Sequence, residues 1–595
     1  MILGSRTLWF SIVSMLCGAT LAWTMSPTGA VANATLDVDI RKVNLIGSPD
    51  VFGAGTHGIS NINRYRQHRV SGINNSRTDA WLQGVLPATT IEEYRSNAKV
   101  RNPASWRWKE LDSRISALYE SGFRIVLVVG YCPQWLSYSN TAFGVPRDWA
   151  IWQDIVGKVY SRYKDKIDFI EVWNEPTMPE FLVLDNSPYT DKKKAYLEIY
   201  KNTAQAVRNT AGGARARLGG PSLNEPKPEF DDWVRLLLED DDARKNLDFL
   251  SYHRYGQYNV TDEFVAHFRR MAAPYGKPDI PVLITEWNFT ARHNQDPMNN
   301  EATEAIPYVA YRLIQQLNAG LSAGQFYNMS DDIEQGDKRL HFRTMDAEGN
   351  LYPKMRSFML LSNQLGLGQG SSLIVDAPFT EVATALGGVN AAGEPVAAAV
   401  NNGYSPAEAS VTFCGLAVTG DEKVEVFEAS GMDDPIFPAQ TVKTPIRDGR
   451  VSLTVTIPPQ SVIGLRLRAS QATLYEAETS GLTGVKAESD AAASGRQAVV
   501  GWEDVGAAVT VKASEAGHYI GLRYASTTAG TLSIYRNGSR ASDIFLERTT
   551  AAGASINSYE TRIIALDVSQ NDSITIKRDA NDCEGMHIDS VLVYR

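Results

Sequence analysis

The sequence predicts a (β/α)₈ barrel followed by two β-sandwich domains. Between residues 50 and 370, short apolar strands alternate with amphipathic helices, a pattern typical of parallel strands joined by crossover helices. Eight such strand–helix units in one segment match a closed barrel. From residue 371 onward the helical period disappears, and short strands continue to the end of the chain.

The eight expected barrel strands follow one another at regular spacing. They span residues 51–55, 74–79, 124–129, 169–172, 216–220, 249–252, 282–285 and 323–327. The helices expected between them include residues 106–120, 149–163, 192–209, 228–238, 261–273 and 306–319. An open doubly wound sheet would need a glycine-rich phosphate loop, and Gly53-Ala54-Gly55 lacks the third glycine of that motif.

The first 32 residues have the three parts of a secretory signal peptide. Arg6 provides a positive start, residues 8–21 an apolar core, and Ala30-Val31-Ala32 a small-residue cleavage site. The apolar core is too short and too interrupted for a membrane span, and no second stretch of spanning length follows. We therefore expect a secreted protein, extracellular or periplasmic, without stable membrane insertion.

The remaining chain divides into four segments. Residues 33–49 contain a strand without a barrel role, which we expect to pair with the accessory sandwich. The barrel covers 50–370, the accessory β-sandwich 371–470, and a jelly-roll β-sandwich 471–595. In the last segment, Asn537-Gly538 is typical of a tight hairpin turn.

The composition excludes several classes of protein. A formal charge of −10 disfavours binding to nucleic acid. After the signal peptide only Cys132, Cys414 and Cys583 remain, which form neither a disulfide framework nor a metal-ligand cluster. No Gly-x-Ser-x-Gly motif indicates a serine hydrolase. The oligomeric state stays open.

Two glutamates stand directly after predicted strands. Glu175 lies in FIEVWNEP and Glu286 in VLITEWN, after the fourth and seventh strands. Carboxylates are costly to bury unless they are paired or used, and strand ends of a barrel face one cleft. A retaining glycosidase places two carboxyl groups about 5 Å apart. We interpret Glu175 as the acid/base and Glu286 as the nucleophile, without a catalytic cofactor.

These two motifs resemble those of glycoside hydrolase clan A. The matching text is Trp173-Asn174-Glu175-Pro176 together with Thr285-Glu286-Trp287-Asn288. The resemblance implies that Asn174 binds a sugar 2-hydroxyl. It also implies that Arg77 is the strand-two arginine that holds the nucleophile ionised. Taken alone, Glu286 could instead be a structural ion-pair partner of Arg77, but its pairing with Glu175 favours the catalytic role.

Within the clan, the chain most resembles glycoside hydrolase family 39. Residues 128–136 resemble its third-strand motif, His253 its sixth-strand histidine, and Ser330-Asp331 its motif after strand eight. Tyr327 stands where that family has tryptophan, which leaves the substrate open. The candidate substrate-binding residues of the barrel are Asn174, Arg77, His57, Trp135, His253, Tyr255 and Tyr327. For His57, His253 and both tyrosines, packing is the alternative role.

The last domain resembles carbohydrate-binding modules of families 6 and 35. The motifs are Tyr475-Glu476-Ala477-Glu478 and His587-Ile588-Asp589-Ser590-Val591. The resemblance implies a structural Ca²⁺ held by Glu476, Glu478 and Asp589, which are hard oxygen ligands. Surface charges at strand ends are the alternative. Trp502 and Asn581 are candidates for sugar contact. A tethered module would concentrate a polymeric substrate near the enzyme.

The sequence thus predicts a secreted, retaining glycoside hydrolase that acts on a polysaccharide or oligosaccharide by double displacement. Two other functions use the same features. One is a catalytically silent carbohydrate-binding protein, and the other a transglycosylase that employs the same glutamates. The sequence identifies neither the sugar, nor its anomeric form, nor whether cleavage is internal or terminal.

Overall fold

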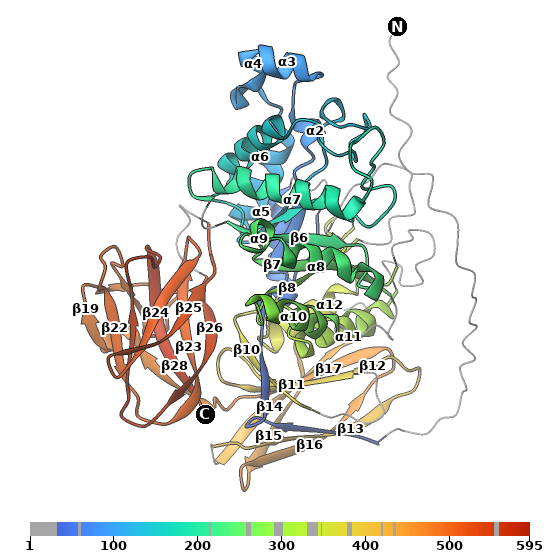
Figure 1. Ribbon diagram of the computed structural model, residues 1–595. Coiled ribbons are helices and arrows are strands. Elements are labelled where there is room, and N and C mark those ends of the chain that lie inside the picture. The colour runs from blue at the N-terminus through green and yellow to red at the C-terminus, as the bar shows by residue number, and fades with distance from the viewer. Residues whose placement is uncertain are drawn as a thin grey trace.

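The computed structural model describes residues 33–595 except 57–60, 214–215, 257–262, 291–301, 330–342, 347, 378–383, 418–419, 432–435 and 552–557. Figure 1 shows the barrel above an accessory sandwich, with a second sandwich beside them. The predicted signal peptide lies outside the described residues. Within the described ranges, no helix has both the length and the apolar character needed to cross a bilayer.

The barrel wall is a parallel sheet whose strands follow one another in chain order. Its strands are β3 (Asn75–Asp79), β4 (Arg124–Val129), β5 (Phe169–Val172), β6 (Arg217–Leu223), β7 (Phe249–Tyr255), β8 (Val282–Asn288) and β9 (Ala323–Phe326). β4 and β5 are buried along their whole length, as expected for strands covered on both faces. The predicted (β/α)₈ fold is confirmed.

The first predicted strand, 51–55, closes the barrel without forming a regular ladder. A short 3₁₀ helix, η1 (Pro49–Val51), occupies its start. The Ala54 amide then donates to the Asn75 carbonyl at 3.1 Å, and the Gly55 amide to the Phe326 carbonyl at 2.8 Å. A Cβ on Gly53 would lie 2.3 Å from the Gly324 carbonyl oxygen, so this close approach requires glycine.

Helices cover the outside of the barrel. The larger ones are α1 (Ile62–Val70), α5 (Lys109–Glu120), α6 (Trp149–Tyr163), α7 (Lys192–Arg208), α8 (Asp231–Glu239), α10 (Phe264–Ala272) and α11 (Ala305–Asn318). α6 illustrates why they form: the Asp148 side chain caps its first turn by accepting from the Ile151 amide at 3.0 Å. Its face with Ile155 and Val159 is buried against the sheet.

Shorter elements lie in the connections. They are α2 (Leu82–Val85), α3 (Ile91–Ser96), α4 (Ala98–Arg101), α9 (Asp241–Arg244), α12 (Met355–Phe358), the π-helix η7 (Met359–Gln364), and the 3₁₀ turns η2 (Pro103–Ser105), η3 (Gln134–Leu136), η5 (Pro228–Phe230), η6 (Ala273–Tyr275), η8 (Ala477–Thr479) and η9 (Ser494–Arg496).

The accessory sandwich consists of two sheets. One has the order β1 (Asn33–Asp39), β13 (Ala407–Cys414), β16 (Arg450–Ile457). The other has the order β15 (Pro438–Ile446), β14 (Gly420–Ala429), β17 (Ser461–Leu467), β12 (Pro395–Asn401), β11 (Thr384–Val389), β10 (Ser372–Val375), β2 (Val43–Gly47). β1 runs parallel to β13, and its Leu36 and Val38 are fully buried in the core between the sheets.

The C-terminal domain is also a two-sheet sandwich. One sheet contains β20 (Lys486–Ser489), β21 (Gln497–Val500), β28 (Met586–Tyr594), β23 (Gly517–Ser526) and β26 (Glu560–Val568), with β18 (Ala472–Glu476) paired to β28. The other contains β19 (Gly481–Thr483), β22 (Ala508–Lys512), β27 (Ser573–Lys577), β24 (Gly530–Arg536) and β25 (Ser539–Leu546). It has its own apolar core, which includes Ile520, Ile534 and Ile576.

Charged side chains join the C-terminal domain to the floor of the barrel, the end where the strands begin. Arg217, the first residue of β6, makes two hydrogen bonds with Glu547, at 2.7 and 2.8 Å. Arg124, the first residue of β4, donates to Glu560 at 2.8 Å. The remaining members of this floor network are Asp50, Asp168, Arg548 and Arg562.

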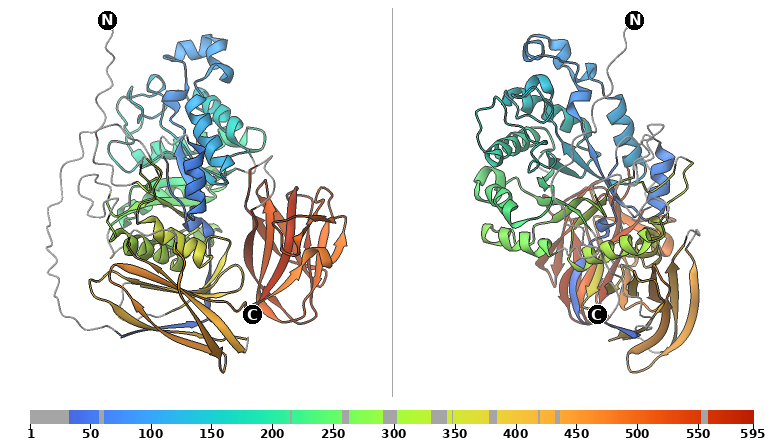
Figure 2. Two further views of the ribbon diagram at one scale, coloured as in Figure 1. Left: turned by 180° about the vertical axis from the view of Figure 1, so that it is seen from behind. Right: turned by 90° about the vertical axis from the view of Figure 1, so that its right-hand side faces the viewer.

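The C-terminal domain is therefore docked, with no free linker. Gln471 is buried at the domain boundary, and its backbone N–H donates to the Gly393 carbonyl at 2.7 Å. In the left view of Figure 2 the domain lies beside the other two, and in the right view it lies behind them. The Tyr594 hydroxyl also donates to the Ala391 carbonyl of the accessory sandwich at 2.7 Å.

The floor network should contribute to stability in a pH-dependent way. Burial opposes the charge of Glu547, but Arg217 and Arg562 outweigh burial and lower the pKa of Glu547 from 4.5 to about 2. A depressed folded-state pKa stabilises the protein above pH 4.5, and this contribution is lost as the pH falls toward 2. Glu547→Gln should therefore lower the free energy of unfolding by about 3–5 kcal/mol at pH 7.

Urea unfolding of wild type and Glu547→Gln between pH 7 and pH 3 measures this effect. The difference between the two proteins should narrow below pH 4.5, because the wild-type carboxylate then approaches its pKa. Glu503→Gln, at an exposed position of the same domain, is the matched control. A difference that stays constant down to pH 3 would contradict the assignment.

Candidate active site

Glu175 and Glu286 lie at the end of the barrel opposite the floor network. Glu175 follows β5 by three residues, and Glu286 lies within β8, two residues before its end. The backbone here is strained: Trp173, Glu175 and Ser222 have φ of 68°, 46° and 52°. Non-glycine residues in this region cost roughly 1–3 kcal/mol each, and such strain concentrates at functional sites.

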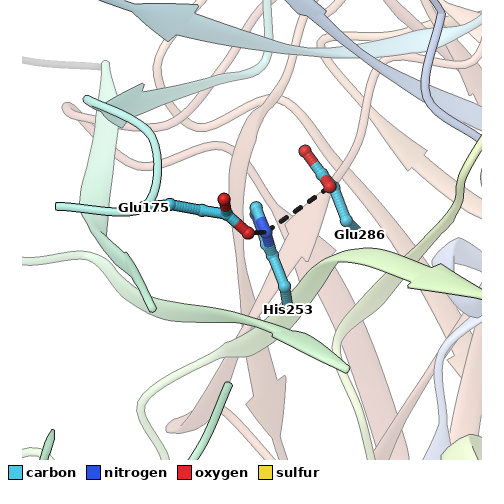
Figure 3. A group of neighbouring side chains, drawn as sticks. All are labelled: Glu175, His253 and Glu286. Atoms are coloured by element: carbon cyan, nitrogen blue, oxygen red, sulfur yellow. Dashed lines mark hydrogen bonds and ion pairs between the residues drawn. The ribbon is translucent and has the colours of Figure 1, made fainter. Parts of the chain in front are cut away.

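The two carboxylates face one another with His253 between them. Figure 3 shows Glu175 and Glu286 entering from opposite sides, with the imidazole of His253 in contact with both. One ligand atom from each of the three side chains lies within 4.8 Å of the others. The side chains of Glu175 and Glu286 are 16% and 13% exposed, so both are partly accessible to solvent.

His253 is fully buried and fixed through both ring nitrogens. Its Nδ1 lies 2.7 Å from Glu175 Oε1 and 3.5 Å from Glu286 Oε2, and its Nε2 lies 3.0 Å from the Ser222 hydroxyl. Burial alone would lower the pKa of His253, but the charges of Glu286 and Glu175 outweigh burial and raise it. The proton on Nδ1 can thus be shared with Glu175.

Arg77 is the buried cation of the site. Its Nη1 donates to Glu286 Oε1 at 2.8 Å, and its Nη2 donates to the Asn174 side-chain oxygen at 2.6 Å. Burial would lower the pKa of Arg77, but Glu171 and Glu286 raise it well above its usual range. One permanent positive charge therefore orients both the carboxylate of Glu286 and the amide of Asn174.

Glu171 completes this arrangement, and the sequence analysis did not identify it. Its side chain is fully buried, accepts from Arg77 Nε at 2.6 Å, and accepts from the Thr285 hydroxyl at 2.8 Å. The signal was present in the sequence as an acidic residue inside an otherwise apolar strand, FIEV. A carboxylate at such a position needs a buried partner.

Tyrosines border the two glutamates. The Tyr255 hydroxyl donates to Glu286 Oε2 at 2.7 Å. Burial and the charge of Glu286 raise the pKa of Tyr255 well above its usual value, so its phenol remains a donor. The ring of Tyr327 packs edge-to-face on Tyr255, with centroids 6.4 Å apart. Both predicted tyrosines therefore lie at the site: Tyr255 contacts Glu286 directly, and Tyr327 packs on Tyr255.

Two other barrel candidates are placed differently. Trp135 is only 7% exposed and stacks on Tyr94, with ring centroids 5.6 Å apart. Its position indicates packing, so the predicted substrate contact is wrong for Trp135. His57 lies outside the described residues.

The three predicted calcium ligands converge on the turn η9 in the C-terminal domain. The Ser494 hydroxyl lies within hydrogen-bond distance of both Glu476, at 2.7 Å, and Asp589, at 2.8 Å. Glu478 Oε2 is buried without a hydrogen-bond partner among the described residues. Burial and the nearby charges of Glu476 and Asp589 raise the pKa of Glu478. Carboxylate oxygens are the ligands that a hard cation prefers, but the guanidinium of Arg523 also pairs with Asp589 Oδ2 at 2.5 Å.

The two predicted sugar contacts of this domain lie in different environments. Trp502 is fully buried in the sandwich core, and its indole N–H donates to the Val499 carbonyl at 3.1 Å. The prediction for Trp502 is wrong, because a tryptophan without exposed surface cannot stack on a sugar. Asn581 lies at an accessible position in the loop between β27 and β28.

The sequence matches a known family over the barrel. The family model described as "Glycosyl hydrolases family 39" matches residues 59–363, just over half of the chain. The chain belongs to glycosyl hydrolase family 39. It is thus a glycoside hydrolase, and the predicted family is confirmed. No curated protein matches the chain in sequence.

Solved structures of glycosidases share the fold of this family 39 enzyme. A glucosidase from Croceicoccus marinus superposes with a TM-score of 0.54 at 14% identity, covering 73% of this chain and 99% of its own. A monomeric β-xylosidase from Caulobacter crescentus has a TM-score of 0.52 at 16% identity, covering 73% and 99%. At these identities the similarity establishes the fold alone.

Replacing Glu171 should weaken catalysis without unfolding the barrel. Glu171→Gln keeps the shape of the side chain but removes the charge that orients Arg77. Hydrogen bonds to charged groups contribute about 1.5–3 kcal/mol, so kcat should fall about 10- to 100-fold with little change in KM. Steady-state kinetics on any substrate that the wild type cleaves measures this.

Two further variants test whether the charge of Glu171 is responsible for the loss of kcat. Glu171→Asp retains the charge and should recover part of kcat, whereas Glu110→Gln, at an exposed position of α5, should leave it unchanged. If Glu171→Gln and Glu171→Asp lose activity equally, the charge of Glu171 has no role.

Proposed function

We propose that this family 39 enzyme is a secreted, retaining glycosidase that cleaves a polysaccharide or oligosaccharide by double displacement. The observation that supports this most directly is the short separation of Glu175 and Glu286: a carboxylate oxygen of one lies within 4.8 Å of a carboxylate oxygen of the other. Retaining enzymes place their carboxyl groups about 5–5.5 Å apart, whereas inverting enzymes need roughly 6.5–9.5 Å to admit a water.

In the first step of this mechanism, Glu286 attacks the anomeric carbon and forms a covalent glycosyl–enzyme ester. Arg77 and Tyr255 both donate to Glu286, which keeps its oxygens oriented toward the sugar. Glu175 donates a proton to the leaving oxygen as the glycosidic bond breaks. Asn174, held by Arg77, is positioned to bind the sugar hydroxyl next to the reacting carbon.

In the second step, Glu175 removes a proton from water, which attacks the anomeric carbon and releases Glu286. His253 assists this change of role, because its Nδ1 lies 2.7 Å from Glu175. A raised pKa lets the imidazole of His253 carry a proton beside the carboxylate. The net configuration at the anomeric carbon is retained after two inversions.

Variants at the two glutamates test the mechanism. Glu286→Ala should lose activity by about 10⁴-fold or more, because no nucleophile remains. Glu175→Ala should keep more activity on activated aryl glycosides than on natural linkages, since a good leaving group needs no acid. Added azide should then attack the covalent intermediate of Glu175→Ala and yield a glycosyl azide of retained configuration.

The measurement is a panel of activated aryl glycosides and polysaccharides, with product configuration read by NMR. Full activity of Glu286→Ala would refute the assignment of the nucleophile. A wild type that cleaves nothing, polysaccharides included, would favour a silent carbohydrate-binding protein. Mainly transferred products at high acceptor concentration would favour a transglycosylase.

We propose that the C-terminal domain is a carbohydrate-binding module with a structural Ca²⁺ held by Glu476, Glu478 and Asp589. The convergence of these carboxylates on η9 supports this. The cation would link the first and last strands of the domain. Asn581 is the proposed contact to sugar.

Removal of calcium should lower the stability of this domain. Calcium at 100 times its Kd stabilises the folded state by about 2.7 kcal/mol. Thermal unfolding after EDTA dialysis, with and without added Ca²⁺, measures the shift, and Mg²⁺ serves as the control ion. Glu478→Gln should abolish the response to Ca²⁺. An equal response in wild type and Glu478→Gln would contradict the proposed ligand set.

A further inference from the structure

Trp81 is a large apolar side chain exposed on the rim of the barrel that carries Glu175 and Glu286. It follows β3, the strand of Arg77, by two residues and is 42% exposed. Its backbone lies in the left-handed region, with φ of 37° and ψ of 69°. An exposed indole and a strained backbone are both unfavourable in the free protein, and such features concentrate at functional sites.

The position of the Trp81 ring is well defined by its neighbours. Its indole lies over Gly84 of α2, where a Cβ would be 3.1 Å from the indole Cδ1. Its ring meets Tyr131 edge-to-face, with centroids 5.9 Å apart and planes at 88°. Contacts on two sides thus fix the ring while much of its surface stays open to solvent.

Tyr131 connects Trp81 to the catalytic residues. The Asn174 side-chain amide donates to the Tyr131 hydroxyl at 2.9 Å, and Asn174 directly precedes Glu175. Tyr131 also packs edge-to-face on Trp173, with centroids 5.2 Å apart. A single aromatic ring therefore separates Trp81 from the side chain that lies beside the reacting carbon in the proposed mechanism.

We propose that Trp81 is an aromatic platform for a sugar ring of the substrate other than the ring attacked by Glu286. Pyranose rings present an apolar C–H face, and a fixed, exposed indole binds such a face at little cost in side-chain entropy. Stacking would cover the indole surface that the free protein exposes. This inference rests on the proposed function and adds that the enzyme acts on chains of at least two sugar units.

The test compares substrates of different length. The probes are a 4-nitrophenyl monosaccharide that the wild type cleaves and oligosaccharides of the same sugar, from two to six units. Trp81→Ala should lower kcat/KM for the longer oligosaccharides about tenfold, mainly through KM, and leave the 4-nitrophenyl monosaccharide unchanged. Trp81→Phe should recover most of the loss. Tyr404→Ala, at an aromatic side chain 65% exposed on the accessory sandwich, is the control.

Two results would contradict the proposal that Trp81 is a sugar platform. An equal loss on short and long substrates would mean that Trp81 only supports Tyr131 and Asn174. An unchanged kcat/KM on every oligosaccharide would mean that Trp81 contacts no sugar. The comparison uses only substrates that Glu286→Ala no longer cleaves. A failure of the proposed mechanism can therefore be distinguished from a failure of the Trp81 proposal. Thermal unfolding of each variant confirms that the barrel is folded.

Discussion

The active site is organised around one buried cation, Arg77. The guanidinium divides its donors among Glu171 within β5, Glu286 of β8 and Asn174, two residues after β5. A buried charge of this kind is tolerable only when every donor has a partner, so these strands must keep their relative heights. The barrel closure, the strand registers and the facing carboxylates all depend on that constraint.

The sequence predicted the parts of this site that follow from strand ends. Glu175, Glu286 and Asn174 each lie next to a recognisable apolar run, so their position could be derived without coordinates. Arg77 lies in a polar strand, and only the family resemblance identified it. Glu171 was missed because it lies within a strand, where alternation of faces decides whether a carboxylate points inward. The contact of His253 with Glu175 also depends on the height of one strand relative to another, which no single sequence motif specifies.

Errors arose where aromatic residues were assigned to sugar binding from their type alone. Trp502 and Trp135 are buried, because large aromatic side chains fill cores as readily as they line binding sites. Conversely, the sequence did not identify Trp81 as a site residue. Its neighbours along the chain do not reveal that contacts with Gly84 and Tyr131 fix its ring at the rim. The predicted first strand, 51–55, is irregular for a similar reason: Gly53 allows a close approach to Gly324 and Asn75.

The floor network constrains how the sequence of this protein can evolve. Arg124 and Arg217 of the barrel are matched to Glu560 and Glu547, more than 300 residues later in the chain. Exchange of the C-terminal segment for that of another protein would leave these arginines facing unrelated side chains. A substitution on either side of this interface is thus constrained by the side chains on the other side, although the two folds are separate.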